Sequence, residues 1–152
     1  MATTAVPPRI TGITKLALAF QVFLLRKNMM GPAGNFIMVL TTKGRKSGKY
    51  FSTPITYIAD GTTYVGTNTG LSNWYKNVQV TPEVTLVIKG KKIKARCIPA
   101  NSPEEKDAIF AIFQREQAAN FPRIFGIPAD SSQDVLNKAR DARVYVRFQP
   151  EG

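Results

Sequence analysis

Residues 35–68 read NFIMVLTTKGRKSGKYFSTPITYIADGTTYVGTN, and their strand and turn signals decide the expected fold. Segments 35–42 and 50–60 are apolar and rich in β-branched and aromatic residues, which favour strands. A cationic loop with two glycines separates them. The dipeptide Asp60-Gly61 is typical of a tight hairpin turn, so the chain is expected to return in a third strand over 62–68.

The middle of the chain continues with a short helix and another hairpin. Residues 73–80 (NWYKNVQV) follow a polar loop, and Ser72 or Asn73 can cap this helix at its N-terminus. Segments 84–90 and 91–99 are expected to form two strands around a turn at Gly90. In the second strand, cations alternate with apolar residues, which predicts one charged and one buried face.

The last third adds helices and a closing strand. Ser102-Pro103-Glu104-Glu105 has the form of a capping box and predicts a helix that extends to residue 120. Residues 121–140 are expected to be irregular and then helical from about Ser132. Residues 142–148 alternate as a strand. The chain is therefore expected to be one mainly β domain with added helices (α+β), over residues 1–152, forming a partly open barrel of about six mostly antiparallel strands.

Residues 1–30 contain an apolar run, 16–25, flanked by Lys15, Arg26 and Lys27. The run is too short to span a bilayer, which needs about 20 apolar residues. It starts like a signal peptide but has no small-residue cleavage site before Arg26. Two interpretations remain: a helix packed on the core, or a cationic helix on a membrane surface.

The charge of the chain favours anionic partners. The formal net charge is +11, and no Asp or Glu occurs before Asp60. Such an imbalance attracts nucleic acid, an anionic membrane or a polyanionic small molecule. Nucleic acid is disfavoured, because no aromatic residues are interleaved with the cationic face of Lys92, Lys94 and Arg96.

Several kinds of chemistry are excluded or disfavoured by composition. The chain has no histidine, which removes imidazole-based catalysis and His-ligated metals. The single cysteine, Cys97, excludes an intrachain disulfide and a multi-Cys metal site, and suits a reducing cytoplasm. Carboxylates are scarce, so paired catalytic acids are not expected. If the protein is an enzyme, a cofactor is expected to supply the chemistry.

The loop within TTKGRKSGKYFSTP (41–54) is a candidate anion site. It is not a P-loop, because Gly44 and Gly48 are too close together and a strand follows. Arg45, Lys46 and Lys49 can bind phosphate or carboxylate, and glycines let backbone N–H groups approach an anion closely. The alternative is an ordinary solvated hairpin tip.

The surroundings of the loop suit a flat ring with a polar edge. Hydroxyl and amide side chains flank it, and the segment TNTG (67–70) ends the next strand, followed by Trp74 and Tyr75. Polar groups beside aromatic rings are typical of sites for heteroaromatic cofactors. Core packing is the alternative explanation for both aromatic residues.

The order LTT-x-GRKSG-x-x-x-x-TP, then DG, TNTG, WYKN and TPEV, resembles the deazaflavin-dependent nitroreductase family. The resemblance is clear over residues 36–87. It implies a split β-barrel related to flavin mononucleotide-binding proteins. It also implies coenzyme F420, whose phospholactyl-oligoglutamate tail is a polyanion, with flavin mononucleotide (FMN) as the alternative.

The resemblance implies a set of site residues. Arg45, Lys46 and Ser47 would meet the tail, and Asn68 and Thr69 would lie near the phosphate. The full set of expected cofactor-binding residues is Thr42, Arg45, Lys46, Ser47, Lys49, Ser52, Thr53, Pro54, Ile55, Thr67, Asn68, Thr69, Trp74, Tyr75 and Asn77. The acceptor pocket would include Phe121 and Phe125, and Tyr75 is a candidate proton donor.

The implied function is hydride transfer from the reduced cofactor to a quinone-like or nitroaromatic acceptor. Members of the family tend to associate with membranes, so the resemblance implies a cytoplasmic protein, with a peripheral position on the inner membrane face as an option. The sequence departs from the family where Phe51 replaces a frequent arginine and where Thr69 stands near the position of a lysine. A non-catalytic cofactor- or ligand-binding barrel and an FMN-dependent reductase remain as alternatives.

Overall fold

The computed structural model describes residues 19, 22, 23 and 35–151. Most of the helix expected within residues 1–30 therefore lies outside the described residues. Val22 is described and buried, and it packs with Val39 and Val87 on the sheet. This contact agrees with packing on the protein at that one position.

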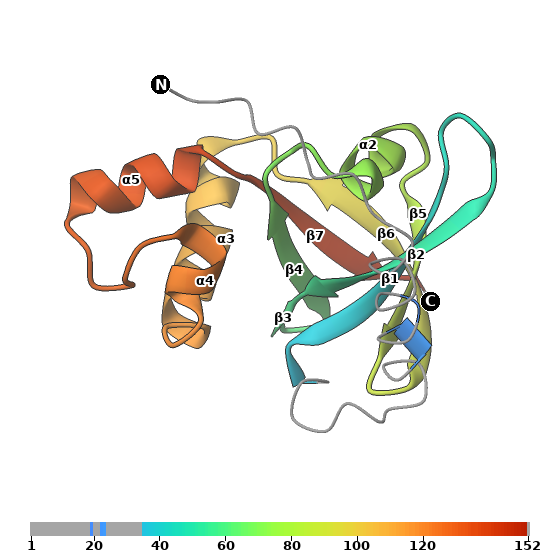
Figure 1. Ribbon diagram of the computed structural model, residues 1–152, viewed down its shortest axis with the longest axis horizontal. Helices are drawn as coiled ribbons and strands as arrows, with labels where there is room; N and C mark the ends of the chain where they lie inside the picture. The colour runs from blue at the N-terminus through green and yellow to red at the C-terminus, as the bar shows by residue number, and fades with distance from the viewer. Residues whose placement is uncertain (1–18, 20–21, 24–34, 152) are drawn as a thin grey trace.

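The strands of the described residues belong to one sheet of seven, in the order β2-β1-β5-β6-β7-β4-β3 (Figure 1). Every neighbouring pair is antiparallel. The strands are β1 (Ile37–Lys43), β2 (Tyr50–Thr56), β3 (Ile58–Asp60), β4 (Thr63–Asn68), β5 (Glu83–Ile88), β6 (Lys91–Pro99) and β7 (Val144–Pro150). The sheet curls into a half-barrel, which confirms the expected split-barrel class.

The single strand expected over 50–60 is in fact two strands, β2 and β3, joined by Tyr57. β2 pairs with β1, whereas β3 pairs with β4 at the other end of the sheet. At the junction, the Tyr57 amide donates to the carbonyl of Phe36 over 2.9 Å. Since two consecutive strands form opposite edges of one sheet, the sheet has to curl until its edges meet.

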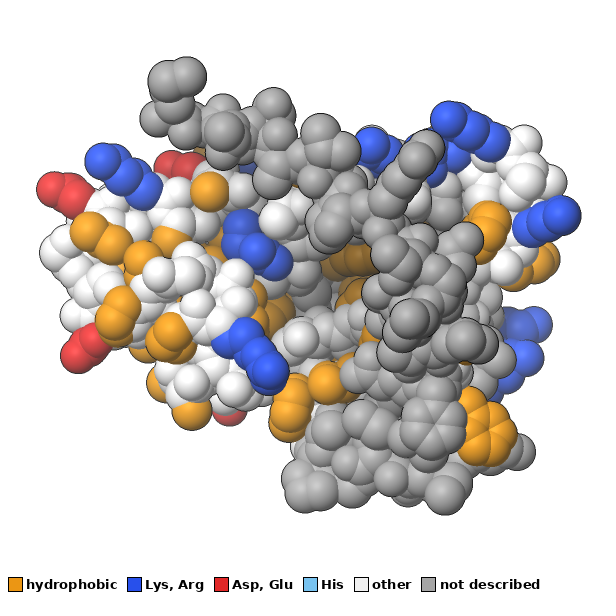
Figure 2. Space-filling view, in the orientation of Figure 1, with side chains coloured by type: hydrophobic (Ala, Val, Ile, Leu, Met, Phe, Trp, Pro, Cys, Tyr) orange, Lys and Arg blue, Asp and Glu red, His pale blue; other side chains and the backbone are white. Residues whose placement is uncertain are grey.

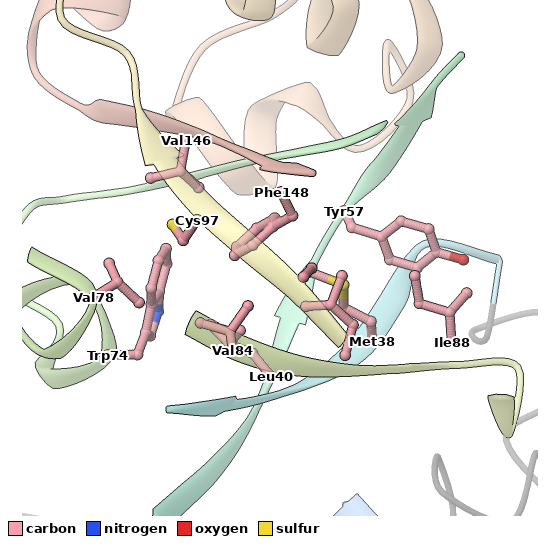
Figure 3. Close-up of a cluster of buried hydrophobic side chains, with 12 residues drawn as sticks. Met38, Leu40, Tyr57, Trp74, Val78, Val84, Ile88, Cys97, Val146 and Phe148 are labelled. Atoms are coloured by element: carbon pink, nitrogen blue, oxygen red, sulfur yellow. The ribbon is translucent and has the colours of Figure 1, made fainter. Parts of the chain in front are cut away.

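The interior of the barrel is a cluster of buried apolar side chains (Figure 3). Met38 and Leu40 enter it from β1, because alternate residues of a strand point to the same face. The short helix α2 (Asn73–Val80) covers one end of the barrel and contributes Trp74 and Val78. Phe148, from β7, packs against Trp74 with ring centroids 6.3 Å apart.

A second cluster lies between the sheet and three helices, α3 (Pro103–Glu116), α4 (Phe121–Phe125) and α5 (Gln133–Asp141). The expected cap of α3 is confirmed, because the Ser102 hydroxyl accepts from the Glu105 amide at 3.1 Å. The helix ends four residues earlier than expected, at Glu116 rather than 120. The single helical turn of α4, with Pro122 near its start, was expected to be irregular.

Arg147 connects the helices to the sheet. From β7, its guanidinium donates to Glu105 in α3 over 2.9 Å and to Asp60 in β3 over 2.7 Å. It also donates to the Thr63 hydroxyl over 2.8 Å. The side chain is 22% exposed, so these charge-assisted bonds are only partly screened by water.

We expect Arg147→Met to lower the free energy of unfolding by about 1.5–3 kcal/mol, because both carboxylates lose their partner. Arg96→Met is the control, since the Arg96–Glu83 pair is more than half exposed and should contribute less than about 1 kcal/mol. Urea denaturation of the two variants measures the difference. Equal effects would contradict a bridging role for Arg147.

Candidate functional site

The loop between β1 and β2 is a compact, backbone-bonded turn. The Gly44 amide donates to the Lys49 carbonyl at 2.7 Å, and the Gly48 amide donates to the Gly44 carbonyl at 3.0 Å. Gly48 has a positive φ of 71°, which favours glycine. A Cβ on Gly44 would lie 2.7 Å from the Phe51 ring. Both glycines are therefore required by the conformation of the turn.

Asn77 of α2 fixes this loop to the barrel. Its side-chain oxygen accepts from the Arg45 amide at 3.2 Å and from the Arg45 guanidinium at 2.8 Å. Its amide group donates to the Thr42 hydroxyl at 3.2 Å. Asn77 and Thr42 are both buried. The three predicted residues are thus brought together, and the loop is held in place rather than being a free hairpin tip.

Within the described part of the chain, the cations of the loop have no acidic partner. Lys46, Ser47 and Lys49 are exposed, and Arg45 is half-buried. Among the described residues, none of the ion pairs includes Arg45, Lys46 or Lys49. In Figure 2 positive side chains gather at the upper right, where Figure 1 places this loop. The loop therefore carries positive charge that an anionic ligand can neutralise.

Asn68, at the end of β4, presents a second polar feature. Its side-chain oxygen accepts from the Gly70 amide at 2.7 Å and from the Ser72 hydroxyl at 2.9 Å. Its Nδ2 donor is buried and has no hydrogen-bond partner among the described residues. Ser72 is the N-cap residue of α2, but its hydroxyl is bound to Asn68 and does not cap the helix. Asn68 is therefore bound to the N-cap residue of α2, whereas Asn77, within α2, is bound to the cationic loop.

The predicted ring-binding residues of β2 divide between the two faces of the strand. Thr53 and Ile55 pair in register with Leu40 and Met38, which both belong to the barrel cluster, so they share the barrel face. Ser52 and Pro54 lie on the opposite face, where the Ser52 hydroxyl is 2.7 Å from that of Thr41. The side chains of all four residues cannot contact one ring from the same side.

The remaining predicted cofactor residues have different surroundings. Thr67 donates to the Val144 carbonyl at 2.8 Å, and Thr69 is exposed. Trp74 is buried in the barrel cluster, so core packing accounts for its position. Tyr75 is half-buried and meets Trp74 edge-on, with ring centroids 6.0 Å apart.

The two phenylalanines predicted for the acceptor pocket are in contact with each other. Phe121 has no exposed surface and stacks on Phe125 with centroids 4.5 Å apart. Phe125 is half-buried, and the Arg143 guanidinium lies 5.5 Å from its ring centroid. Phe121 can therefore act as support, and only Phe125 is accessible. The sequence pattern did not single out Arg143.

Burial raises the pKa of two described side chains in the protein interior. Burial raises the pKa of the Cys97 thiol to about 12, so it stays protonated and is a poor nucleophile. Burial likewise raises the pKa of Tyr145, whose hydroxyl donates to the Arg140 carbonyl. Among the described residues, no three His, Cys, Asp or Glu side chains cluster as metal ligands would.

The surface grooves of the described residues include three that lie elsewhere. One, of about 580 Å³, is lined by residues that include Thr41, Tyr50 and Lys92. A second shares Thr41 and Tyr50 and adds Lys43 and Lys94. None of the three includes Arg45, Asn68 or Asn77. The polar network is therefore the stronger guide to a ligand.

No helix within the described part of the chain is long and apolar enough to cross a bilayer.

A curled antiparallel barrel with an uncompensated cationic loop defines the class of protein, a cofactor-binding split barrel. Within that class, the chain belongs to the F420H(2)-dependent quinone reductase family, whose family model matches residues 25–123. The family relationship confirms both the resemblance seen in the sequence and coenzyme F420 as the cofactor. No curated protein sequence matches the chain.

Solved structures with the same fold include one described as an F420-H2 dependent reductase, FDR-A. It has a TM-score of 0.54 at 17% identity, covering 74% of this chain and 93% of its own. A putative pyridoxamine 5'-phosphate oxidase from Listeria innocua has a TM-score of 0.55 at 13% identity, covering 88% and 93%. An FAD-binding protein from Mesorhizobium loti has 0.53 at 11%, covering 88% and 90%. At these identities the structures show a shared fold.

We expect Asn77→Ala to lower the free energy of unfolding by about 1–3 kcal/mol, because Thr42 and the Arg45 amide lose their buried partner. The loop should also become easier to cleave with trypsin after Arg45 and Lys46. Asn73→Ala, an exposed change in the same helix, is the control. Cleavage rates that match in the two variants would show that Asn77 does not hold the loop.

Proposed function

We propose that this protein is a reductase that passes hydride from reduced coenzyme F420 to a quinone-type acceptor, with nitroaromatic compounds as further candidates. The observation that carries the proposal is the cationic loop, held by Asn77 and without any acidic partner among the described residues. A loop that is both ordered and uncompensated is suited to binding a polyanion, because the ligand does not have to displace internal ion pairs.

The residues present fit the chemical groups of this cofactor. The cationic loop would hold the oligoglutamate tail, as the resemblance implies. The unpartnered Nδ2 donor of Asn68, beside the N-terminus of α2, would meet the phosphate. Thr53 and Ile55, on the barrel face of β2, would lie along the ring. Ser52 and Pro54 would reach it only through their backbone groups.

The bound cofactor supplies the hydride, and the chain contributes binding and orientation. Such a step needs the donor and acceptor held close and aligned, and it gains rate from positioning rather than from a titrating side chain. The lack of histidine and the inert Cys97 thiol are consistent with a protein that binds and orients the reactants while the cofactor supplies the chemistry. We propose Tyr75, which is half-buried, as the candidate proton donor to the acceptor.

We expect Arg45→Ala combined with Lys46→Ala to weaken binding of coenzyme F420 by more than about tenfold, since each charge-assisted contact contributes roughly 1.5–3 kcal/mol. A fluorescence titration measures this, with FMN in parallel. Arg115→Ala with Lys138→Ala removes the same charge from two exposed helical positions and should have little effect.

Unchanged affinity in the loop variant would place the tail elsewhere. Binding of FMN alone would keep the fold and change the cofactor, as the similar FAD-binding structure makes conceivable. Tight binding of reduced F420 without faster reduction of menadione would favour a non-catalytic carrier.

We expect Asn68→Asp to weaken binding of coenzyme F420 by about tenfold or more, because a carboxylate oxygen replaces the Nδ2 donor near the phosphate. Asp keeps an oxygen that can accept from Gly70 and Ser72, but Asn68 is buried, so the new carboxylate should also lower thermal stability. Binding is therefore measured at a temperature at which thermal unfolding shows the variant to be folded. Ser131→Asp, an anionic change at a distant turn, controls for net charge. Wild-type affinity in Asn68→Asp would remove Asn68 from the site.

A further inference from the structure

Arg143, immediately before β7, is a half-buried cation with an unusual environment. Its Nε donates to the Thr67 hydroxyl at 3.2 Å, and its guanidinium carbon lies 5.5 Å from the Phe125 ring centroid. It takes part in none of the ion pairs between described residues. Burial lowers the pKa of its guanidinium, which reflects the cost of holding the charge away from water.

Two other half-buried arginines of the same region, Arg140 and Arg147, are paired with carboxylates. Arg140 pairs with Asp107 at 2.7 Å and with Asp141 at 3.0 Å. Arg147 pairs with Asp60 at 2.7 Å and with Glu105 at 2.9 Å. Each thus has two carboxylates, whereas Arg143 has none among the described residues. A half-buried charge without a counterion is destabilising, and an anionic ligand at Arg143 would supply the missing counterion.

The surroundings of Arg143 also fix its direction. The Thr67 hydroxyl donates to the Val144 carbonyl at 2.8 Å, so it is oriented to accept from Nε of Arg143. The Phe125 ring under the guanidinium is backed by the stacked ring of Phe121. The Nε edge is therefore occupied. The edge formed by Nη1 and Nη2 has no hydrogen-bond partner within the described part of the chain, and it can fork onto two oxygens of one anion.

We propose that Arg143 is an oxyanion-binding residue that holds a carboxylate or phosphate group of a ligand through its Nη1 and Nη2 edge. The proposal rests on the proposed function, because it places this anion in the reductase site. Arg143 contacts both Thr67, a predicted cofactor-binding residue, and Phe125, which was predicted for the acceptor pocket. The anion is thus either the cofactor phosphate or an anionic oxygen of the acceptor, and the two sources are separable by experiment.

The cofactor arm compares coenzyme F420 with its phosphate-free parent, the same deazaflavin ring carrying only the ribityl chain. If Arg143 binds the phosphate, Arg143→Gln should weaken F420 binding by about tenfold or more and the parent by less than about twofold. Arg143→Lys should fall between, because it keeps the charge and loses the fork. Arg123→Gln, an exposed cation in α4, should match wild type.

The acceptor arm of the experiment compares two quinones. One is 2-hydroxy-1,4-naphthoquinone, an anion at neutral pH, and the other is uncharged menadione. If Arg143 binds the acceptor, Arg143→Gln should raise KM for the anionic quinone by about tenfold, leaving menadione and cofactor affinity unchanged. Thermal unfolding is measured for each variant first. Equal losses for all ligands together with a lower Tm would show a structural role and overturn the proposal, as would no change in either arm.

If the proposed reductase function is wrong, the binding experiments give a result that differs from both arms above. In that case wild type binds neither F420 nor the phosphate-free deazaflavin, and inorganic phosphate becomes the probe. Stabilisation of wild type by phosphate in a thermal shift, lost in Arg143→Gln and kept in Arg123→Gln, would still support an oxyanion site. No stabilisation of wild type by phosphate would overturn it.

Discussion

The structure depends on one topological constraint, namely that β2 and β3 are consecutive in the chain yet form opposite edges of the sheet. Only Tyr57 separates them, so the sheet is closed through the backbone itself. The closure brings β4 close to β2: a Cβ on Gly66 would lie 3.8 Å from the Thr56 carbonyl oxygen. As a result, one helix, α2, lies close to both parts of the site. Asn68, at the end of β4, is hydrogen-bonded to its N-cap residue Ser72, and the cationic loop before β2 is hydrogen-bonded to its Asn77.

This constraint explains which features were predictable from sequence. The hairpins at Gly61 and Gly90 and the Ser102 cap depend on neighbouring residues, and they were predicted correctly. The break at Tyr57 was not predicted, because apolar, β-prone residues continue through it and only the change of pairing partner reveals it. Phe51 to Ile55 likewise divide between two faces in a way that only the register with β1 establishes.

The site shows the same distinction. The cationic loop was visible as a local pattern, but its attachment to Asn77 spans residues 32 apart in the sequence. Arg143 contacts Thr67, 76 residues away, and nothing in its local sequence separates it from Arg140 or Arg147. What distinguishes these arginines is the presence or absence of carboxylates around them, which is a property of the folded chain.

The placement of the few acidic residues therefore links fold to function. Asp60 and Glu105 are bound to Arg147, which joins α3 to the sheet. Asp107 and Asp141 are bound to Arg140, which joins α5 to α3. Their charges neutralise structural cations and leave the loop uncompensated. With a net charge of +11 and acids committed elsewhere, binding a polyanion relieves repulsion within the loop. The loop is ordered by Asn77 and by its backbone hydrogen bonds, whereas affinity for the cofactor tail would come from its uncompensated charge. A bound cofactor would then strengthen the part of the fold that holds it.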